Sequence, residues 1–290
     1  MAAPQSASRR VRTYLVLTLA LSSIFWFLII RAGTLSGGNG MWVLGLMWCP
    51  GVAAILASLA TGRPLSQIGW RWSWRYAALG YAIPVAYGAV AYGATRALGL
   101  GAFPDAAFVA TQAPRFGGPG ASTAEILARY VLLQGSAGVL FSCVSGLGEE
   151  IGWRGFLVPE LFRRMSFTRV ALVSGAIWAA WHYPILLFAD YNAGTAPVYG
   201  LACFTVLVVG IAFVFAWIRL KSGSVWPAAI LHGSHNLWIQ QVFDPLTADT
   251  GRTKWIIGEF GAALAVTAIG VAWLTWRCRA QILLPAAEAA

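Results

Sequence analysis

The chain has 290 residues, of which 59% are apolar and only 10% are charged, and its mean hydropathy is +0.69. An ordinary soluble domain carries about 25% charged residues, so this composition excludes a soluble globular protein and indicates a membrane protein. The formal net charge of +10 favours the lipid bilayer, with its anionic headgroups, as a partner and argues against nucleic acid.

Eight apolar runs are long enough to cross a bilayer, which takes about 20 helical residues. In chain order they cover about residues 14–30, 41–60, 77–95, 126–148, 170–189, 198–218, 224–243 and 255–275. We therefore expect an all-α fold, a polytopic membrane helix bundle with about eight transmembrane helices. The spans leave no room for a separate soluble domain, so residues 1–290 are predicted to form a single membrane domain. The longest connection, residues 101–125, is predicted to be an external loop.

The distribution of Lys and Arg predicts the orientation. One set of alternate helix ends and loops holds 14 of them, namely Arg9, Arg10, Arg12, Arg63, Arg71, Arg75, Arg154, Arg163, Arg164, Arg169, Arg219, Lys221, Arg277 and Arg279. The other set holds 6, namely Arg31, Arg96, Arg115, Arg129, Arg252 and Lys254. Because cytoplasmic loops are rich in Lys and Arg, we expect a multi-pass protein of the cell membrane with cytoplasmic N- and C-termini.

The first group of ionisable residues closes the fourth apolar run. Glu150 and Arg154 are four residues apart, so on a continuing helix they share a face and can pair. Glu149 points about 100° away and is free to act as a base. Gly148 and Gly152 form a G-x-x-x-G pair that lets another helix approach closely. The alternative interpretation is that these charges are the solvated end of a helix.

The second and third groups are histidines within apolar runs, where ionisable groups are costly and usually functional. His182 lies inside the fifth run, with Trp178 one turn earlier on the same face. In the seventh run His232, His235 and Asn236 fall within five residues, and His232 shares a helix face with the other two. The structural alternative is a set of hydrogen bonds between helices.

The depths of these groups predict one site. With cytoplasmic termini, the fifth and seventh runs enter from the cytoplasm and carry His182 and His232 about eight to twelve residues in, while Glu149 lies at the cytoplasmic end of the fourth. At ~1.5 Å per residue the groups span the cytoplasmic half of the bilayer. We therefore expect them to line one cavity that is open to the cytoplasm.

Together the three segments resemble the CPBP family, the CAAX-protease and bacteriocin-processing (Abi) intramembrane peptidases. The family motifs are E-E-x-x-x-R, F-x-x-x-H and H-x-x-x-N/D, on separate helices in that order. A tryptophan replaces the usual phenylalanine, and the motif-bearing core covers about residues 126–243. The matching residues are Glu149-Glu150-x-x-x-Arg154, Trp178-x-x-x-His182 and His232-x-x-x-Asn236.

The resemblance implies an intramembrane endopeptidase, a membrane protease of the CAAX prenyl protease type. By analogy, Glu149 and His182 would activate a water molecule, and His232 with Asn236 would donate hydrogen bonds to the oxyanion. Glu150 with Arg154 would brace the first motif helix. The expected substrate is a peptide or protein; a C-terminal, lipidated one is the substrate of the family's prenyl-protein members, and most bacterial members are not tied to it.

A metal mechanism is the main open point. Zinc in a catalytic site normally has three protein ligands and one water. The chain supplies that count with His182 and His232 plus either Glu149 or His235. It lacks H-E-x-x-H, however, and Asn236 occupies a position where zinc gains little. We therefore expect that no cofactor is required, with Zn²⁺ as the alternative, so the protease is either glutamate-type or a metalloprotease.

Two other functions fit the same residues. A non-catalytic membrane immunity or regulatory protein of the same fold would keep these motifs without cleaving anything. A proton-coupled transporter would use intramembrane Glu and His as a relay and would favour inverted repeats; no repeat is evident in the sequence.

Overall fold

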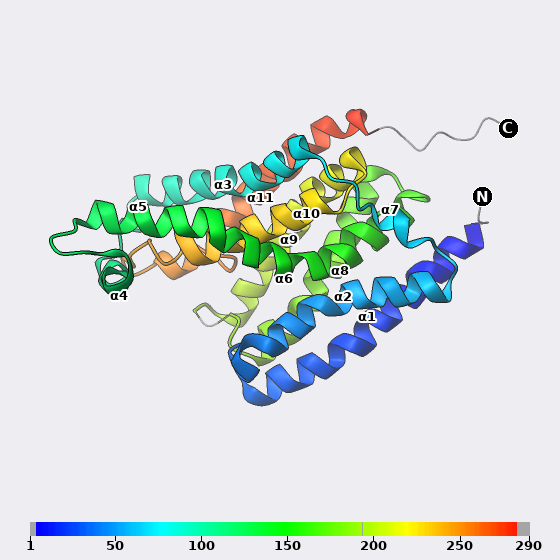
Figure 1. The fold of residues 1–290 in the computed structure, drawn as a ribbon, viewed down its shortest axis with the longest axis horizontal. Coiled ribbons are helices and arrows are strands. Elements are labelled where there is room, and N and C mark those ends of the chain that lie inside the picture. Colours follow the sequence, from blue (N-terminus) through cyan, green and yellow to red (C-terminus); the bar gives the residue numbers. More distant parts are fainter. Residues whose placement is uncertain (1–3, 193, 283–290) are drawn as a thin grey trace.

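The computed structural model describes residues 4–192 and 194–282 and shows a bundle of helices (Figure 1). Within these ranges no strand forms, apart from a single bridge between Ala102 and Ala248. The predicted all-α polytopic bundle is confirmed. The α-helices are α1 (Pro4–Ala32), α2 (Met41–Ala60), α3 (Trp74–Ala97), α4 (Ala106–Phe116), α5 (Thr123–Leu133), α6 (Val139–Gly152), α7 (Val158–Phe162), α8 (Phe167–Phe188), α9 (Pro197–Ser222), α10 (Trp226–Asn236) and α11 (Ala262–Arg277).

Shorter helical segments extend or link these helices. Three of them, η3, η4 and η5, are π-helical. The segments η3 and η4 connect helices on both sides, and η5 extends α10. The segments are η1 (Gly37–Gly40), η2 (Leu65–Ile68), η3 (Gln134–Gly138), η4 (Trp153–Leu157), η5 (Leu237–Phe243), η6 (Thr253–Trp255) and η7 (Cys278–Gln281).

Six helices among the described residues are long and apolar enough to cross a membrane. They match the first six predicted spans and cover Ala7–Ala32, Gly37–Ala60, Trp74–Ala97, Thr123–Phe162, Phe167–Phe188 and Pro197–Ser222. The seventh predicted span is the helix formed by α10 and η5. The eighth was placed too early: α11 starts at Ala262, because Gly258 adopts a left-handed conformation (φ +74°) that ends the preceding turn.

The fourth span is one continuous helix of 40 residues, from Thr123 to Phe162, built from α5, η3, α6, η4 and α7. The sequence placed its end at residue 148, where the charged residues begin. That prediction was wrong because Glu150 and Arg154 are buried and form an ion pair within the helix. Their charges are therefore satisfied inside the bundle and do not need to face water.

Residues 101–125 are not simply the external loop that the sequence predicted, because the helix α4 occupies 11 residues of this segment. The Asp105 side chain accepts a hydrogen bond from the Phe108 backbone N–H (2.8 Å) and caps the helix. One face of α4 is apolar and packs on α5, where Val109 and Phe116 join Ile126 and Tyr130 in a small separate core. The amphipathic pattern of α4 explains why this connection folds.

The G-x-x-x-G pair brings α6 against α2, as predicted. A Cβ at Gly148 would lie 2.8 Å from Trp48 Cα, and a Cβ at Gly152 would lie 2.5 Å from Pro50 Cβ. Real Cβ atoms do not come this close to neighbouring atoms, so only glycine fits at either position. This close approach holds the helix that carries Glu149 and Glu150 deep inside the bundle.

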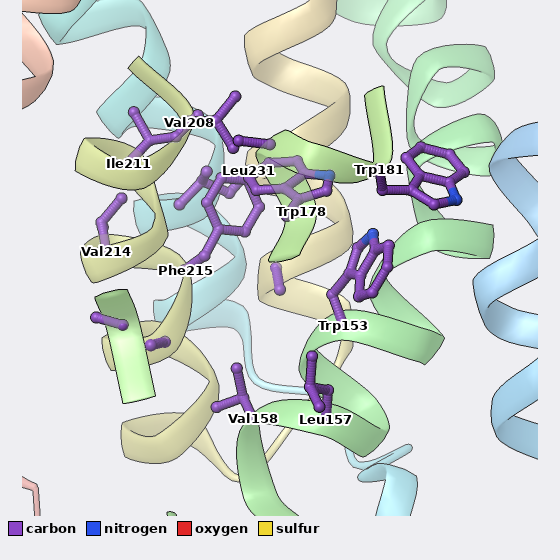
Figure 2. Packing of buried hydrophobic residues seen from close by; sticks show 14 of the residues in the cluster. Trp153, Leu157, Val158, Trp178, Trp181, Val208, Ile211, Val214, Phe215 and Leu231 are labelled. Carbon is purple, nitrogen blue, oxygen red and sulfur yellow. The ribbon is translucent and has the colours of Figure 1, made fainter. Parts of the chain in front are cut away.

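The main core lies where α6, α8, α9 and α10 meet (Figure 2). Trp178 and Phe215 pack edge to face with ring centroids 5.2 Å apart, and Trp153 packs in the same way on Trp181 at 5.8 Å. By contrast, large apolar side chains elsewhere point outward, as expected for a surface covered by lipid. Among them are Val16, Phe27 and Phe141, each more than 60% exposed.

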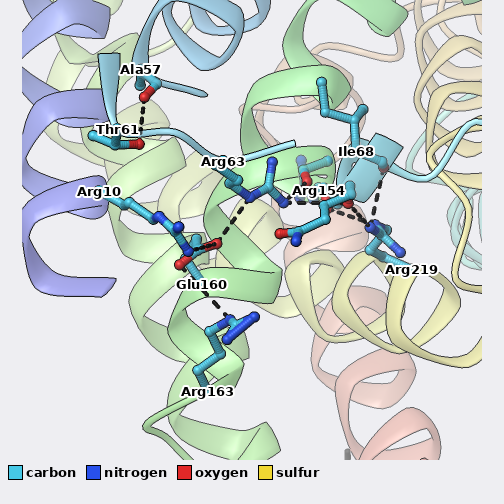
Figure 3. A network of polar contacts seen from close by, with 11 residues as sticks. Arg10, Ala57, Thr61, Arg63, Ile68, Arg154, Glu160, Arg163 and Arg219 are labelled. Carbon is cyan, nitrogen blue, oxygen red and sulfur yellow. Dashed lines mark hydrogen bonds and ion pairs between the residues drawn. The ribbon is translucent and has the colours of Figure 1, made fainter. Parts of the chain in front are cut away.

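One end of the bundle carries an arginine cluster, which we define as Arg10, Arg63, Arg163 and Arg219 near Glu160 (Figure 3); all of these arginines except Arg163 are buried. Glu160 accepts a hydrogen bond from Arg63 Nε (2.9 Å), and Arg10 and Arg163 approach it to 3.8 and 4.0 Å. Arg219 donates to the backbone carbonyls of residues 67 and 68. These contacts join α1, α7 and α9 to the connection between α2 and α3. This arginine-rich end is also the end at which α1 begins and α11 ends (Figure 1).

Candidate active site

The predicted site residues converge on one cavity of about 150 Å³. The walls come from α2, α8, α9 and α10, with Glu149 from α6. Of the residues singled out from the sequence, those that line it are Glu149, Trp178, His182, His232, His235 and Asn236. Glu150 and Arg154 do not line the cavity and lie directly behind it. The three motifs therefore form one site, as predicted.

Glu149 is buried and is held by two tryptophans. Its Oε2 accepts a hydrogen bond from Trp153 Nε1 (3.1 Å) and one from Trp178 Nε1 (2.7 Å). No hydrogen bond reaches Oε1 from any residue within 4–192 or 194–282, and the side chain lines the cavity. Neutral indole donors fix the position of a carboxylate without cancelling its charge, so Glu149 keeps the ability to accept a proton.

Glu150 forms the ion pair that the sequence predicted and also a contact that it did not predict. Its Oε1 accepts from Arg154 Nη1 (2.8 Å) and contacts His232 Nδ1 (2.9 Å). This contact requires α6 and α10 to lie close together. Gly146 makes that possible, since a Cβ there would lie 3.0 Å from His232 Cβ. Glu150 therefore orients the His232 ring and leaves its Nε2 for the cavity.

Arg154 packs behind two aromatic side chains that line the cavity. Its guanidinium lies over the rings of Trp178 and Phe215, 4.0 Å from each centroid. Such stacking on aromatic faces stabilises a desolvated cation. The Arg154 carbonyl accepts a hydrogen bond from Arg219 Nε (2.8 Å), so Arg154 is connected to the arginine cluster.

His182 is half-buried, and its contacts indicate which ring nitrogen carries the proton. His182 Nδ1 lies 2.9 Å from the carbonyl oxygen of Trp178, which can only accept. Nδ1 is therefore assigned as the donor, which leaves the lone pair of the neutral ring on Nε2. Phe204 and Trp181 pack on the ring, with centroids 5.1 and 4.8 Å away.

His235 is held on both sides. Its Nε2 lies 3.0 Å from Glu259 Oε1, and its Nδ1 contacts the Tyr87 hydroxyl. Glu259 in turn accepts from the Tyr191 hydroxyl through Oε2 (2.8 Å). Both ring nitrogens are thus engaged, which removes His235 from the groups available to a substrate. Asn236, by contrast, is half-buried and lines the cavity.

Sequence reasoning missed Glu259, although it is buried and lines the cavity. The signal was present, because Glu259 is an ionisable residue within the eighth predicted span, where such residues are usually functional. The hydrogen bonds from Trp153 and Trp178 to Glu149 were also missed. They depend on side-chain directions that residue spacing does not specify.

Several atoms of the candidate metal ligands are engaged in hydrogen bonds. Among the residues that the structure describes, no group of three or more His, Cys, Asp and Glu side chains is arranged to hold a metal ion. His235 has no free nitrogen, and His232 has one nitrogen occupied by Glu150. Glu149 Oε2 is taken by two indole N–H groups. For the ligand set His182, His232 and Glu149, these contacts leave His182 Nε2, His232 Nε2 and Glu149 Oε1 free, whereas His235 could bind zinc only by giving up one of its contacts.

The cavity lies nearer one end of the bundle than predicted. Glu149 is not at a helix end but 13 residues before Phe162, or about 20 Å at 1.5 Å per residue. The cavity extends from Glu149 to Leu35, Tyr191 and Glu259, which lie in connections at the end opposite the termini. The prediction that the cavity opens to the cytoplasm used a helix end at residue 148, which the structure moves to Phe162. The side of the membrane that the cavity faces stays a prediction.

Comparison with known proteins supports the resemblance carried by the motifs. Residues 125–238 match the family model described as Type II CAAX prenyl endopeptidase Rce1-like. A curated protein from Methanococcus maripaludis named CAAX prenyl protease 2 is 32% identical over 108 residues, which is 35% of this chain. The match spans 38% of that relative's length. The part of the chain that builds the cavity is thus similar to the CPBP family of intramembrane peptidases.

Proposed function

We propose that this protein is an intramembrane endopeptidase that hydrolyses peptide bonds with a water molecule activated by Glu149 and His182. The observation that carries the proposal is the environment of Glu149: a buried carboxylate fixed by two neutral donors, with His182, His232 and Asn236 on the same cavity. A positioned base in a site shielded from bulk water is what general-base catalysis requires.

In the proposed reaction, Glu149 and His182 Nε2 remove a proton from water, and the hydroxide adds to the carbonyl carbon of the scissile bond. The carbon–nitrogen bond then breaks, and the departing nitrogen takes up that proton from Glu149 or His182. His182 suits this exchange because its Nδ1 is committed to the Trp178 carbonyl. The proton balance closes within the site, and no other reactant is needed.

The oxyanion would be stabilised by His232 and Asn236. His232 directs Nδ1 at the Glu150 carboxylate, so its ring can donate from Nε2 when it is an imidazolium. Preorganised donors of this kind lower the barrier for acyl transfer.

The test is cleavage of a peptide library by the purified, detergent-solubilised protein, with Glu149→Gln and a chelator in parallel. We expect Glu149→Gln to lose at least about 10²-fold in rate, because it removes the general base. The chelator is expected to have no effect. Glu125→Gln is the matched control, since Glu125 is exposed and only caps α5.

Three results would contradict the proposal. Cleavage that survives in Glu149→Gln would exclude Glu149 as the base. Loss of cleavage with the chelator, restored by Zn²⁺, would replace the glutamate mechanism with a metal one. If the wild-type protein cuts no peptide under any condition, the peptidase function itself fails and the regulatory alternative takes its place.

A further inference from the structure

A second and larger hollow lies on the surface of the bundle between α3, α9 and α11, and we call it the outer groove. Its walls come from residues 83–90 of α3, from Val214 and Trp217 of α9, and from residues 266–278 of α11 and its C-cap. It measures about 610 Å³, and no charged residue lines it. Apolar side chains on its walls, such as Leu274, are exposed. Pockets of this volume are large enough to hold a small molecule.

The outer groove is about as long as one leaflet of a bilayer is thick. Val266 and Cys278 both line it and are twelve residues apart, or about 18 Å along the helix axis. The hydrocarbon core of a bilayer is about 30 Å thick, so one leaflet takes about half of that. Between them lies Gly270, where a Cβ would meet no neighbouring atom within 4 Å. The groove thus has the length and the open wall that one acyl chain requires.

Two arginines lie at one end of the outer groove, because α3 begins and α11 ends at the arginine-rich end. Arg277 follows Gly270 by seven residues, so it lies on the face of α11 that borders the groove. The Arg75 guanidinium lies over the Tyr76 ring, 5.8 Å from its centroid, and Tyr76 packs on Trp217 with centroids 6.3 Å apart.

Both arginines are available to an anion. Arg75 and Arg277 are exposed, and neither forms an ion pair with any carboxylate in the described part of the chain. Arginine binds phosphate through charge-assisted hydrogen bonds from its planar guanidinium. An apolar groove with cations at one end therefore matches a molecule with an apolar chain and an anionic head.

We propose that the outer groove binds one anionic phospholipid of the bilayer. An acyl chain lies along Gly270, and the headgroup phosphate lies between Arg75 and Arg277. The bound chain packs on Tyr87, whose hydroxyl contacts His235 of the active-site cavity. The lipid site is thus one side chain away from the candidate active site, but its binding does not depend on the proposed peptidase function.

The test measures how added lipid stabilises the purified, detergent-solubilised protein, because a ligand that binds only the folded state raises the melting temperature. Phosphatidylglycerol and phosphatidylcholine with identical acyl chains are compared, and bound lipid is counted by native mass spectrometry. Gly270→Leu fills the groove. Gly93→Leu is the matched control, since both glycines are exposed, helical and open at the Cβ position, but Gly93 does not line the groove.

We expect phosphatidylglycerol to raise the melting temperature of the wild type and of Gly93→Leu more than phosphatidylcholine does, with one molecule retained in the mass spectrum. Gly270→Leu should lose both the shift and the retained molecule. Arg75→Gln and Arg277→Gln leave the apolar walls intact and should each weaken binding about fivefold. Arg12→Gln, which removes an exposed arginine of α1 at the same end, should leave binding unchanged.

Three outcomes would overturn the inference. Equal stabilisation by the two lipids would exclude recognition of an anionic headgroup. Equal retention of lipid by Gly270→Leu and Gly93→Leu would exclude the groove as its site. A wild-type dimer that carries no lipid and that Gly270→Leu dissociates would assign the groove to a second copy of the chain.

Discussion

The two ends of the bundle bury carboxylates in different ways. At the arginine-rich end, Glu160 lies near three cations, Arg10, Arg63 and Arg163, which together more than neutralise its charge. At the cavity, Glu149 receives hydrogen bonds only from two indole N–H groups, while the nearby Arg154 pairs with Glu150. Cations lock a carboxylate into the structure. Neutral donors hold it in place and leave its charge available for chemistry.

The largest effect that would sharpen this comparison is expected from Glu160→Ala. The substitution leaves Arg63 buried without its carboxylate, and breaking a buried ion pair in this way costs about 3–5 kcal/mol. Thermal unfolding in detergent measures the loss. Glu125→Ala, which removes an exposed capping-box carboxylate, should cost much less. Equal losses for the two variants would show that the arginine cluster does not stabilise this end of the bundle.

Asp244 offers a second test, because it too is buried with a neutral donor, the Tyr92 hydroxyl. Burial raises the pKa of Asp244 to about 7. The folded protein therefore holds a proton that the unfolded chain releases near pH 4, so stability falls as the pH rises from about 4 to about 7. Asp244→Asn should remove this loss and raise stability above pH 7 by up to about 4 kcal/mol.

Melting temperatures of Asp244→Asn and wild type at pH 5 and pH 8 measure that effect. The difference between the two proteins should be larger at pH 8. A constant difference at both pH values would mean that Asp244 is already ionised in the folded protein. The neutral Tyr92 donor would then be sufficient to stabilise a buried charge without a cost.

The smallest expected effect is that of Trp178→Phe. The change keeps an aromatic ring beneath Arg154 but removes one of the two indole donors to Glu149. A rate loss of about tenfold, or roughly 1.4 kcal/mol, is expected in kcat with KM unchanged, since the lost donor holds the base and not the substrate. Trp181→Phe is the control, because its indole donates to Ser22. An unchanged kcat would show that Trp153 alone positions Glu149.

The sequence predicted the composition of the site better than its surroundings. Glu149, His182, His232 and Asn236 stand out because ionisable and amide groups are costly in apolar helices, and the structure brings all four to one cavity. The fold class followed from the length and number of the apolar runs. Both kinds of prediction rest on the energetic cost of polar groups in lipid, which is visible in the residue types alone.

What could not be predicted depends on tertiary contacts. The charges at Glu149 and Glu150 indicated a helix end, and only the pairing with Arg154 and His232 shows why the helix continues. Glu259 lies on a turn after Gly258, outside any helical periodicity that would direct it toward α10. The depth of Glu149 was counted from the same wrong helix end, since the helix continues to Phe162.

The size of the cavity has a consequence for the turnover rate of the proposed peptidase. A volume of about 150 Å³ holds a few water molecules, whereas pockets that enclose a ligand usually measure about 300–1,000 Å³. A peptide strand can therefore reach Glu149 only when the surrounding segments move apart. Segment motions of this kind take microseconds to milliseconds and set an upper limit on turnover. Catalysis here would then respond to membrane thickness and fluidity, which alter the opening of the bundle and leave the bond-breaking step itself unchanged.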